Sequence, residues 1–467
     1  MNLRAIANRL TSGAFELTEG LFLRLLGLTY LCAFGSLWPQ ILGLTGSHGI
    51  APAVNLMTAM RGQLGARAFF YAPSLFWLNA SDTALTLFCG LGCVCGMLLL
   101  AGLFSRWMAA ACFVLYLSIV SVGQPFTSFQ WDALLLEAGF LALFAGAPWL
   151  VWAYRLLLFR LMFESGLVKL TSGDPNWRNL HALRFHFMTQ PLPNPIAYYV
   201  YHAPNWMLDS LTAVTLAIEL LAPFLLFFPR KLRIAGVIAL ILLQVTILLT
   251  GNYAFFNLLA LALCLWGLDD TTFAPLGRLL RRRFPPSNIP KSKSLLNGMN
   301  GCVAVMSVLG LLQLIGHAPI FIQPFEIVNG YGLFAVMTTS RPEIVVEGSE
   351  DRTNWKEYSF RYKPGNLHRG LPLVAPYQPR LDWQMWFAAL GRYETNSWVG
   401  SLMYRLLLGD ASVTALLNPA PFPKPPRYMR ALVYEYDFTT PAERSRSGAI
   451  WQRRLLGTWF GPVALKQ

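Results

Sequence analysis

The chain has 467 residues, of which 55% are hydrophobic and only 13% are charged. Soluble domains carry about a quarter charged residues, so this composition excludes an ordinary soluble enzyme and a disordered protein. The formal net charge is +14, but the basic residues lie in short loops between apolar stretches, which indicates membrane topology rather than nucleic-acid binding. The sequence therefore predicts a multi-span membrane protein.

Nine apolar runs are long enough, or nearly long enough, to cross a bilayer. They cover residues 21–44, 84–104, 106–123, 131–153, 156–170, 207–229, 234–250, 252–267 and 301–319. Threading them from a cytoplasmic N-terminus puts most basic loop residues on the cytoplasmic side, among them Arg4, Arg9, Arg281, Arg282 and Arg283, as the positive-inside rule requires. We therefore predict a transmembrane helical domain of about nine spans over residues 1–319.

Two of the predicted extracytoplasmic loops are long, and they cover residues 47–83 and 171–205. Both combine aromatic, proline and basic residues, such as Arg61, Arg67 and Trp177. This mixture is typical of short helices that lie among lipid headgroups. We expect such interfacial helices in both loops and expect membrane lipids as binding partners.

Residues 320–467 differ from the rest of the chain, because they contain no apolar run of membrane length. Apolar and polar residues alternate over 344–346, 358–363 and 432–438, which predicts half-buried strands. Helical patterns cover 381–390 and 397–408, and a proline-rich connector covers 418–426. The predicted fold is an α-helical polytopic membrane bundle followed by a soluble, extracytoplasmic, β-sandwich-like α+β domain.

Several polar residues lie inside the apolar runs, where an ionised group is costly unless it has a partner. Glu164 follows Arg160 by one helical turn and lies within reach of Lys169, so we expect an ion pair there. Asp132 and Glu137 are five residues apart and project about 140° from each other on a helix, which disfavours a carboxylate dyad. The predicted buried polar network comprises Asp132, Glu137, Arg160, Glu164, Lys169, Glu219, Asn252 and Asn257.

Local catalytic and metal-binding motifs are missing from the sequence. No pair among His181, His186 and His202 has the spacing of a helical metal site. There is neither a G-x-S-x-G nucleophile elbow nor a phosphate-binding loop. We therefore predict no metal, no cofactor and, on balance, no enzymatic activity.

Five segments carry a resemblance to a known family. They are ESGLVKLTSGDPNWRNLHAL from Glu164, HFMTQPLPNPIAYYVYHAP from His186, LTGNYAFFNLL from Leu249, VNGYGLFAVMTTSRPEIVVEGS from Val328 and QPRLDWQMWFAAL from Gln378. Together they resemble the lipase maturation factor family, in membrane and soluble parts alike. The resemblance implies a membrane factor that helps a secreted client, a lipase, to fold in the endoplasmic reticulum.

The single sequon of the chain, Asn79-Ala80-Ser81, is weak support for glycosylation. We therefore expect a bacterial homologue in the inner membrane, or an endoplasmic reticulum protein if the source is eukaryotic. The sequence departs from the family pattern at Met188 and Tyr377, where a Glu and a His are expected. These departures argue against a catalytic role for the loop that follows His186.

Two readings of function follow. In the first, the chain is a non-catalytic maturation factor whose client contacts are Trp383, Trp386 and Phe387, although aromatics at this spacing more often form a core stripe. In the second, it is a membrane enzyme distantly similar to the vitamin K-dependent carboxylases, which acts on a lipid-soluble cofactor or substrate. Its candidate bases are Lys169, His181 and His186, since a desolvated Lys has a lowered pKa.

Overall fold

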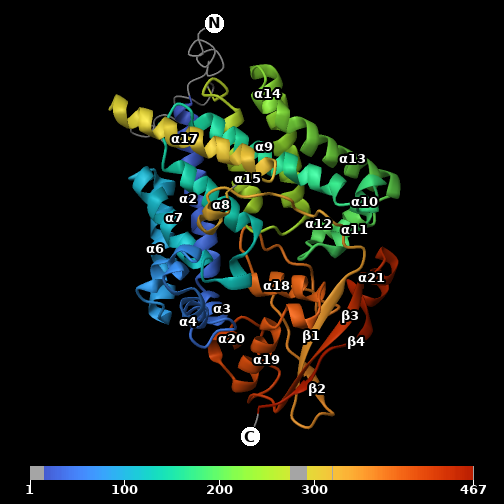
Figure 1. Cartoon of the computed structure of the whole chain (residues 1–467). Coiled ribbons are helices and arrows are strands. Elements are labelled where there is room, and N and C mark those ends of the chain that lie inside the picture. The colour runs from blue at the N-terminus through green and yellow to red at the C-terminus, as the bar shows by residue number, and fades with distance from the viewer. Residues whose placement is uncertain (1–14, 274–291, 318, 466–467) are drawn as a thin grey trace.

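A computed structural model describes residues 15–273, 292–317 and 319–465 (Figure 1). The basic residues Arg4, Arg9 and Arg281, on which the predicted topology partly depends, lie outside these ranges. A helical bundle forms the N-terminal part, and a small sheet with helices forms the C-terminal part. The helices of the bundle are α2 (Glu16–Leu37), α3 (Ile41–Thr45), α4 (Ala53–Leu64), α5 (Ala68–Tyr71), α6 (Asp82–Ala101), α7 (Ser105–Val120), α8 (Gln130–Ala142), α9 (Leu150–Thr171), α10 (Pro175–Arg178), α11 (Ala182–Thr189), α12 (Pro195–Tyr201), α13 (Asn205–Leu221), α14 (Arg230–Thr250), α15 (Phe256–Cys264) and α17 (Lys293–Leu314).

Five helices of the described chain are long and apolar enough to cross a membrane. They cover Glu16–Leu37, Asp82–Ala101, Asn205–Phe227, Arg230–Thr250 and Ser294–Leu314. The other predicted spans correspond to α7, α8 and α15, which have 16, 13 and 9 residues, and to the charged helix α9. A bilayer core needs about 20 apolar residues in one helix, so five spans are supported by length and composition.

The predicted span 131–153 is not one helix. Helix α8 ends at Ala142 and α9 begins at Leu150. Gly146 in the connection has a φ of 88°, a left-handed conformation that glycine adopts without steric cost, and Pro148 could not continue a helix. The apolar run therefore contains a turn and is not one continuous helix, which the hydropathy of the sequence did not indicate.

Several helices begin directly after a residue whose side chain caps the helix N-terminus. Side-chain oxygens of Ser81, Asp174, Asn194, Ser292 and Thr440 accept backbone N–H groups at the starts of their helices. These bonds satisfy donors that have no partner within the helix. In the loop 171–205, α10 and α12 are capped in this way. In the loop 47–83, α4 and α5 have no side-chain cap, and α5 leaves Phe69, Phe70 and Tyr71 exposed.

The C-terminal part is built on one antiparallel sheet of four strands in the order β2-β1-β3-β4. The strands are β1 (Pro342–Ser349), β2 (Trp355–Glu357), β3 (Tyr428–Phe438) and β4 (Trp451–Val463), and the helices are α18 (Arg380–Ala389), α19 (Trp398–Leu408), α20 (Ala411–Thr414) and α21 (Pro441–Ser447). Predicted strands 344–346 and 432–438 lie in β1 and β3. Helices α18 and α19, and not a second sheet within the described residues, pack on this sheet.

Two strand assignments differ from the sequence-based prediction. Residues 358–363 form only an isolated bridge, Phe360 to Leu417, because the backbone N–H groups of Tyr362 and Lys363 bind the Asp382 carboxylate instead of a strand. Strand β4 was not predicted. Its exposed positions include consecutive residues on both faces, so it lacks the alternation from which strands are recognised.

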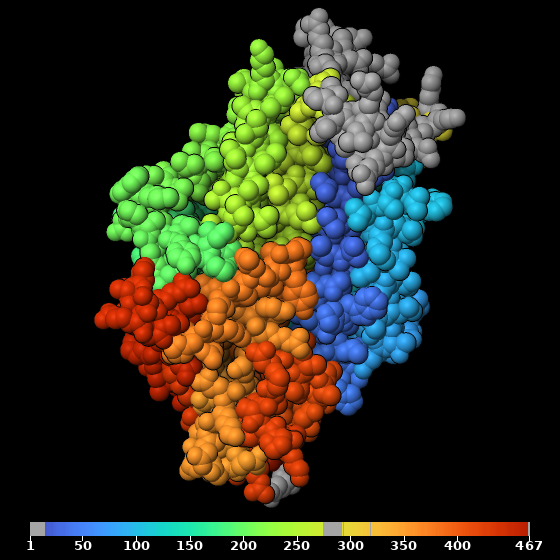
Figure 2. Space-filling view, turned by 180° about the vertical axis from the view of Figure 1, so that it is seen from behind, coloured from blue at the N-terminus to red at the C-terminus, as the bar shows by residue number. Residues whose placement is uncertain are grey.

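The two parts of the chain are joined by the buried guanidinium of Arg380 at the start of α18. Its Nη1 and Nη2 each donate to a different oxygen of Asp132 in α8, both over 2.9 Å. Nη1 also donates to the carbonyl of Phe126 and Nη2 to the Tyr116 hydroxyl. Both charged side chains are fully buried. Figure 2 shows the same junction from behind, where the segment drawn in orange lies directly against the helices of the bundle.

A second arginine makes a similar connection from the first strand. Arg341, the residue before β1, is fully buried and donates to the carbonyl oxygens of Met188 at the end of α11 and of Gln190 and Pro191 in the loop that follows. Its charge is balanced by Glu343, which also binds Lys363. The sheet is thereby held against α11 and the loop that follows it.

We predict that Arg380→Met lowers the stability of the whole chain by about 3–5 kcal/mol, because it leaves the Asp132 carboxylate buried without its partner. The double variant Asp132→Leu/Arg380→Met should recover much of this loss, since no buried charge remains. Thermal melting and protease resistance of the full chain in detergent measure both. Arg392→Met, at an exposed site, is the matched control. A single variant as stable as this control would contradict the prediction.

Candidate functional site

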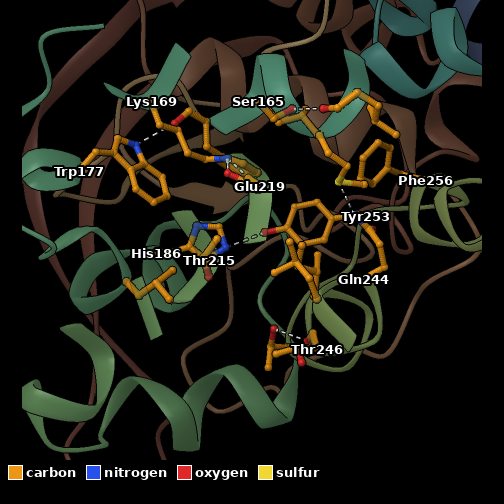
Figure 3. A pocket seen from close by; sticks show the side chains of 18 of the residues that line it. Ser165, Lys169, Trp177, His186, Thr215, Glu219, Gln244, Thr246, Tyr253 and Phe256 are labelled. Carbon is orange, nitrogen blue, oxygen red and sulfur yellow. Dashed lines mark hydrogen bonds and ion pairs between the residues drawn. The ribbon is translucent and has the colours of Figure 1, made fainter. Parts of the chain in front are cut away.

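A cavity of about 100 Å³ lies between α9, α11, α13 and α14 (Figure 3). It brings together Lys169 and His186, two of the three predicted catalytic candidates. The wall is mainly apolar, with Leu161, Met162, Leu243, Ile247 and Phe256 among its side chains. The geometry around Lys169 and His186 therefore decides whether either side chain can act as a base.

Lys169 forms a buried ion pair, but with Glu219 of α13 instead of the predicted Glu164. Its Nζ lies 2.7 Å and 2.6 Å from the two carboxylate oxygens of Glu219, and both side chains are almost fully buried. Gly166 allows this approach, because a Cβ at that position would lie 2.9 Å from the Cβ of Glu219. The ammonium is thus held in a two-oxygen contact and is not available as a free base.

Glu164 makes the expected contact with Arg160 and has a second partner. Its Oε1 lies 3.6 Å from Arg160 Nε, and its Oε2 accepts the backbone N–H of Tyr331 over 2.6 Å. Arg160 binds Glu137 more closely, at 2.6 Å. The second Glu137 oxygen accepts from the Tyr331 hydroxyl and from the backbone N–H of Asn329. Glu137 of α8 and Glu164 of α9 therefore both contact Arg160 and the segment that follows α17.

His186 is part of a chain of hydrogen bonds. The Gln190 amide nitrogen donates to the carbonyl of Thr250 over 2.9 Å, which leaves its oxygen to accept from the Tyr253 hydroxyl, also over 2.9 Å. The Tyr253 oxygen lies 3.0 Å from His186 Nε2 and has no further proton to give, so we assign Nε2 as the donor. Burial, and in second place the charge of Lys169, lower the pKa of His186 to about 4. The imidazole is therefore neutral at pH 7.

His181, the third candidate, is not among the residues that line the cavity. It lies at the N-terminal end of α11 and donates its backbone N–H to the carbonyl of Asn176. The structure thus brings two of the three candidate bases together. One is ion-paired and the other donates through Nε2 to a tyrosine, an arrangement that orders the protein. The Nδ1 atom of His186 keeps its lone pair, but with a pKa of about 4 it is a weak base at pH 7.

The two predicted asparagines also join segments. Asn252 donates to the carbonyls of Leu192 and Pro372, and its oxygen accepts the backbone N–H of Val374. Asn257 donates to the side-chain oxygen of Gln244 over 2.8 Å. Asn252 therefore ties the C-terminal part to the loop before α15, whereas Asn257 acts within the bundle.

Of the three candidate client contacts, Trp383 and Trp386 are buried, with exposed fractions of 3% and 6%, and belong to the core stripe that the sequence analysis gave as the alternative. Trp386 donates its N–H to the carbonyl of Thr189 over 2.9 Å, and Trp383 packs edge-to-face on Trp131 with ring centroids 4.7 Å apart. Phe387 is 44% exposed and stays a candidate contact. All three line a second, larger cavity of about 550 Å³ between α18 and α8.

The residues that complete these contacts escaped the sequence analysis. Arg380, Arg341, Asn329 and Tyr331 all come from the C-terminal part, far along the chain from their partners in the bundle. A buried cation was needed for Asp132, but no local spacing indicated which one. Within the described residues, no group of three or more His, Cys, Asp or Glu side chains is arranged to hold a metal ion.

Comparisons with known proteins agree with the motifs of the sequence. The model of the lipase maturation factor transmembrane domain matches residues 17–275, and that of the lipase maturation factor C-terminal domain matches residues 327–461. The chain is 35% identical to lipase maturation factor 1 of Bos taurus, over 99% of this chain and 92% of that protein. It is 33% identical to lipase maturation factor 1 of Homo sapiens (98% and 90%) and 34% identical to lipase maturation factor 2 of Gallus gallus (93% and 79%). No solved structure matches.

We predict that His186 makes the protein less stable in acid. Its pKa in the folded chain, about 4, is below the unfolded value of about 6.5. The unfolded chain therefore takes up the proton first as the pH falls, and stability that is present above pH 6.5 is lost between about pH 6.5 and 4.

Between pH 7.5 and 5 the wild-type chain should lose about 2 kcal/mol more than His186→Gln, a variant that keeps a donor for Tyr253. Melting temperatures of the detergent-solubilised chain over this pH range provide the comparison. His368→Gln, at an exposed position, is the control and should behave as wild type. Equal pH dependence in wild type and His186→Gln would show that His186 is not held neutral.

Proposed function

The chain belongs to the lipase maturation factor family, and from this membership we propose that it is a membrane-embedded factor that assists the maturation of a secreted lipase. The observation that carries the proposal is the match of both family domains along one chain. The geometry supports a role without catalysis, because the candidate bases are engaged with Glu219 and Tyr253. Nothing in the site favours the carboxylase-like alternative.

We place the client contact on the outer rim of the larger cavity. Phe387, Leu390 and Val336 line this cavity and are 44%, 43% and 66% exposed. Exposed apolar side chains that are grouped together are typical of protein-binding surfaces. The contacts of Arg380 and Arg341 with the bundle keep the rim at a fixed position relative to the membrane helices, where a folding lipase could reach it.

We predict that Phe387→Ser reduces lipase maturation by severalfold while the variant itself stays folded, because a half-exposed ring contributes more to a contact than to the core. The measurement is the secreted lipase activity per amount of lipase protein in cells that co-express both chains. Leu373→Ser, at a residue that is 77% exposed and lies outside the rim, is the control. Normal maturation with Val336, Phe387 and Leu390 all changed to Ser would contradict the assignment of the rim.

We further propose that the C-terminal domain faces the periplasm or the lumen of the endoplasmic reticulum. The support is the distribution of basic residues over the loops and the nature of the client, which is secreted. The relatives named above are animal proteins, and a bacterial inner membrane stays a prediction from the sequence alone.

A reporter enzyme that is active only in the cytoplasm tests this topology. Fused after Gln467 it should be silent, because the fusion point would lie on the far side of the membrane. The same reporter fused after Pro229, in the connection before α14 that is predicted to be cytoplasmic, should be active and shows that the fusion method works. Strong activity after Gln467 would place the domain in the cytoplasm and overturn the proposal.

A further inference from the structure

The larger cavity has the size and lining of a ligand site. It measures about 550 Å³ and lies between the start of α8, the segment 332–338 and α18. Aromatic rings of Phe129, Trp131, Phe334, Trp383 and Trp386 form much of its wall. No charged side chain lines it among the residues that the structure describes. Cavities of this size with mainly apolar walls and few polar groups are typical of small-molecule sites.

One polar group in the wall has no partner. The indole N–H of Trp383 is buried and makes no hydrogen bond within the described part of the chain. The neighbouring indoles differ, since Trp131 donates to Gln378 Oε1 over 2.8 Å and Trp386 donates to the Thr189 carbonyl over 2.9 Å. Buried donors are normally satisfied, so the Trp383 N–H is left for an acceptor from outside the described chain, which a ligand in the cavity or a water molecule can supply.

The cavity also adjoins the membrane-facing part of the bundle. Tyr253, Leu333 and Phe334 line both this cavity and the smaller one that contains Lys169. The smaller cavity continues between α13 and α14, two of the candidate membrane helices. An apolar chain that comes from the bilayer therefore has apolar side chains along its route to Trp383.

We propose that the larger cavity binds the acyl chain of an uncharged lipid, whose ester carbonyl accepts the Trp383 N–H. An uncharged ligand follows from the lack of a lining cation that could pair with a fatty-acid carboxylate. A single carbonyl acceptor fits the single unpartnered indole. This inference concerns a ligand of the factor itself and does not depend on the proposed client contact.

The test uses the full chain in phosphatidylcholine nanodiscs and a monoacylglycerol with a photoreactive diazirine in its acyl chain. After irradiation, mass spectrometry should find the label on peptides that contain residues 128–131, 332–338 or 383–390, and excess unlabelled monoacylglycerol should compete. Trp383→Phe removes the donor and keeps a ring, so competable labelling should fall about three- to tenfold. Trp459→Phe, whose N–H donates to Gly391 outside the cavity, should label as wild type.

A second variant tests the cavity without changing the buried Trp383, whose replacement could itself destabilise the fold. Val336→Trp adds bulk at an exposed residue of the rim and should also lower labelling, with an unchanged melting temperature. Label found only on the outer faces of α13 and α14, or labelling that Trp383→Phe does not change, would overturn the proposal. Equal labelling by a diazirine fatty acid would overturn its uncharged character. Protection by an apolar peptide, without competition by monoacylglycerol, would assign the cavity to a client segment instead.

Discussion

The ion pair between Asp132 and Arg380 is the contact on which the arrangement of the two parts depends. A fully buried carboxylate and guanidinium are each costly to desolvate, and only good geometry with satisfied hydrogen bonds repays that cost. Here both carboxylate oxygens accept from the guanidinium over 2.9 Å, and the Phe126 carbonyl and the Tyr116 hydroxyl accept the other two Nη protons. Helix α18 begins at Arg380. The position of the C-terminal domain on the bundle therefore follows from the need of the buried Asp132 carboxylate for a cationic partner.

The other buried charges obey the same constraint. Glu137 forms an ion pair with Arg160 and accepts hydrogen bonds from Tyr331 and Asn329. Arg341 donates to three carbonyls at the end of α11 and in the loop after it, and Lys169 pairs with Glu219. In each case the partner comes from another element, so these polar groups specify which segments lie together. Lys169 is ion-paired at the smaller cavity, and His186 has a free lone pair only on Nδ1, where its lowered pKa makes it a weak base.

The two cavities place apolar space between the lipid-facing helices and the aqueous face of the C-terminal domain. Their common wall of Tyr253, Leu333 and Phe334 is held by the hydrogen bonds of His186 and Gln190. His186, a candidate base in the sequence analysis, acts here as a neutral hydrogen-bond donor that orients Tyr253 between the two cavities. The rim around Phe387 is accessible from the aqueous side, which suits a factor that meets a lipase as it folds near the membrane.

Sequence alone determined the class of the protein. Hydropathy identified the long apolar helices, two-residue alternation identified β1 and β3, and the run RLDWQMWFAA identified α18, because these signals are local and repeat over many residues. Motif resemblance identified the family, which the comparisons confirm. Tertiary structure decided the rest: the reversal at Gly146, strand β4, the burial of Trp383 and Trp386, and the choice of Glu219 over Glu164 for Lys169. Each of these depends on a partner distant in sequence or on a single backbone angle. The sequence shows that a buried charge needs a partner, whereas the packing of the helices determines which residue that partner is.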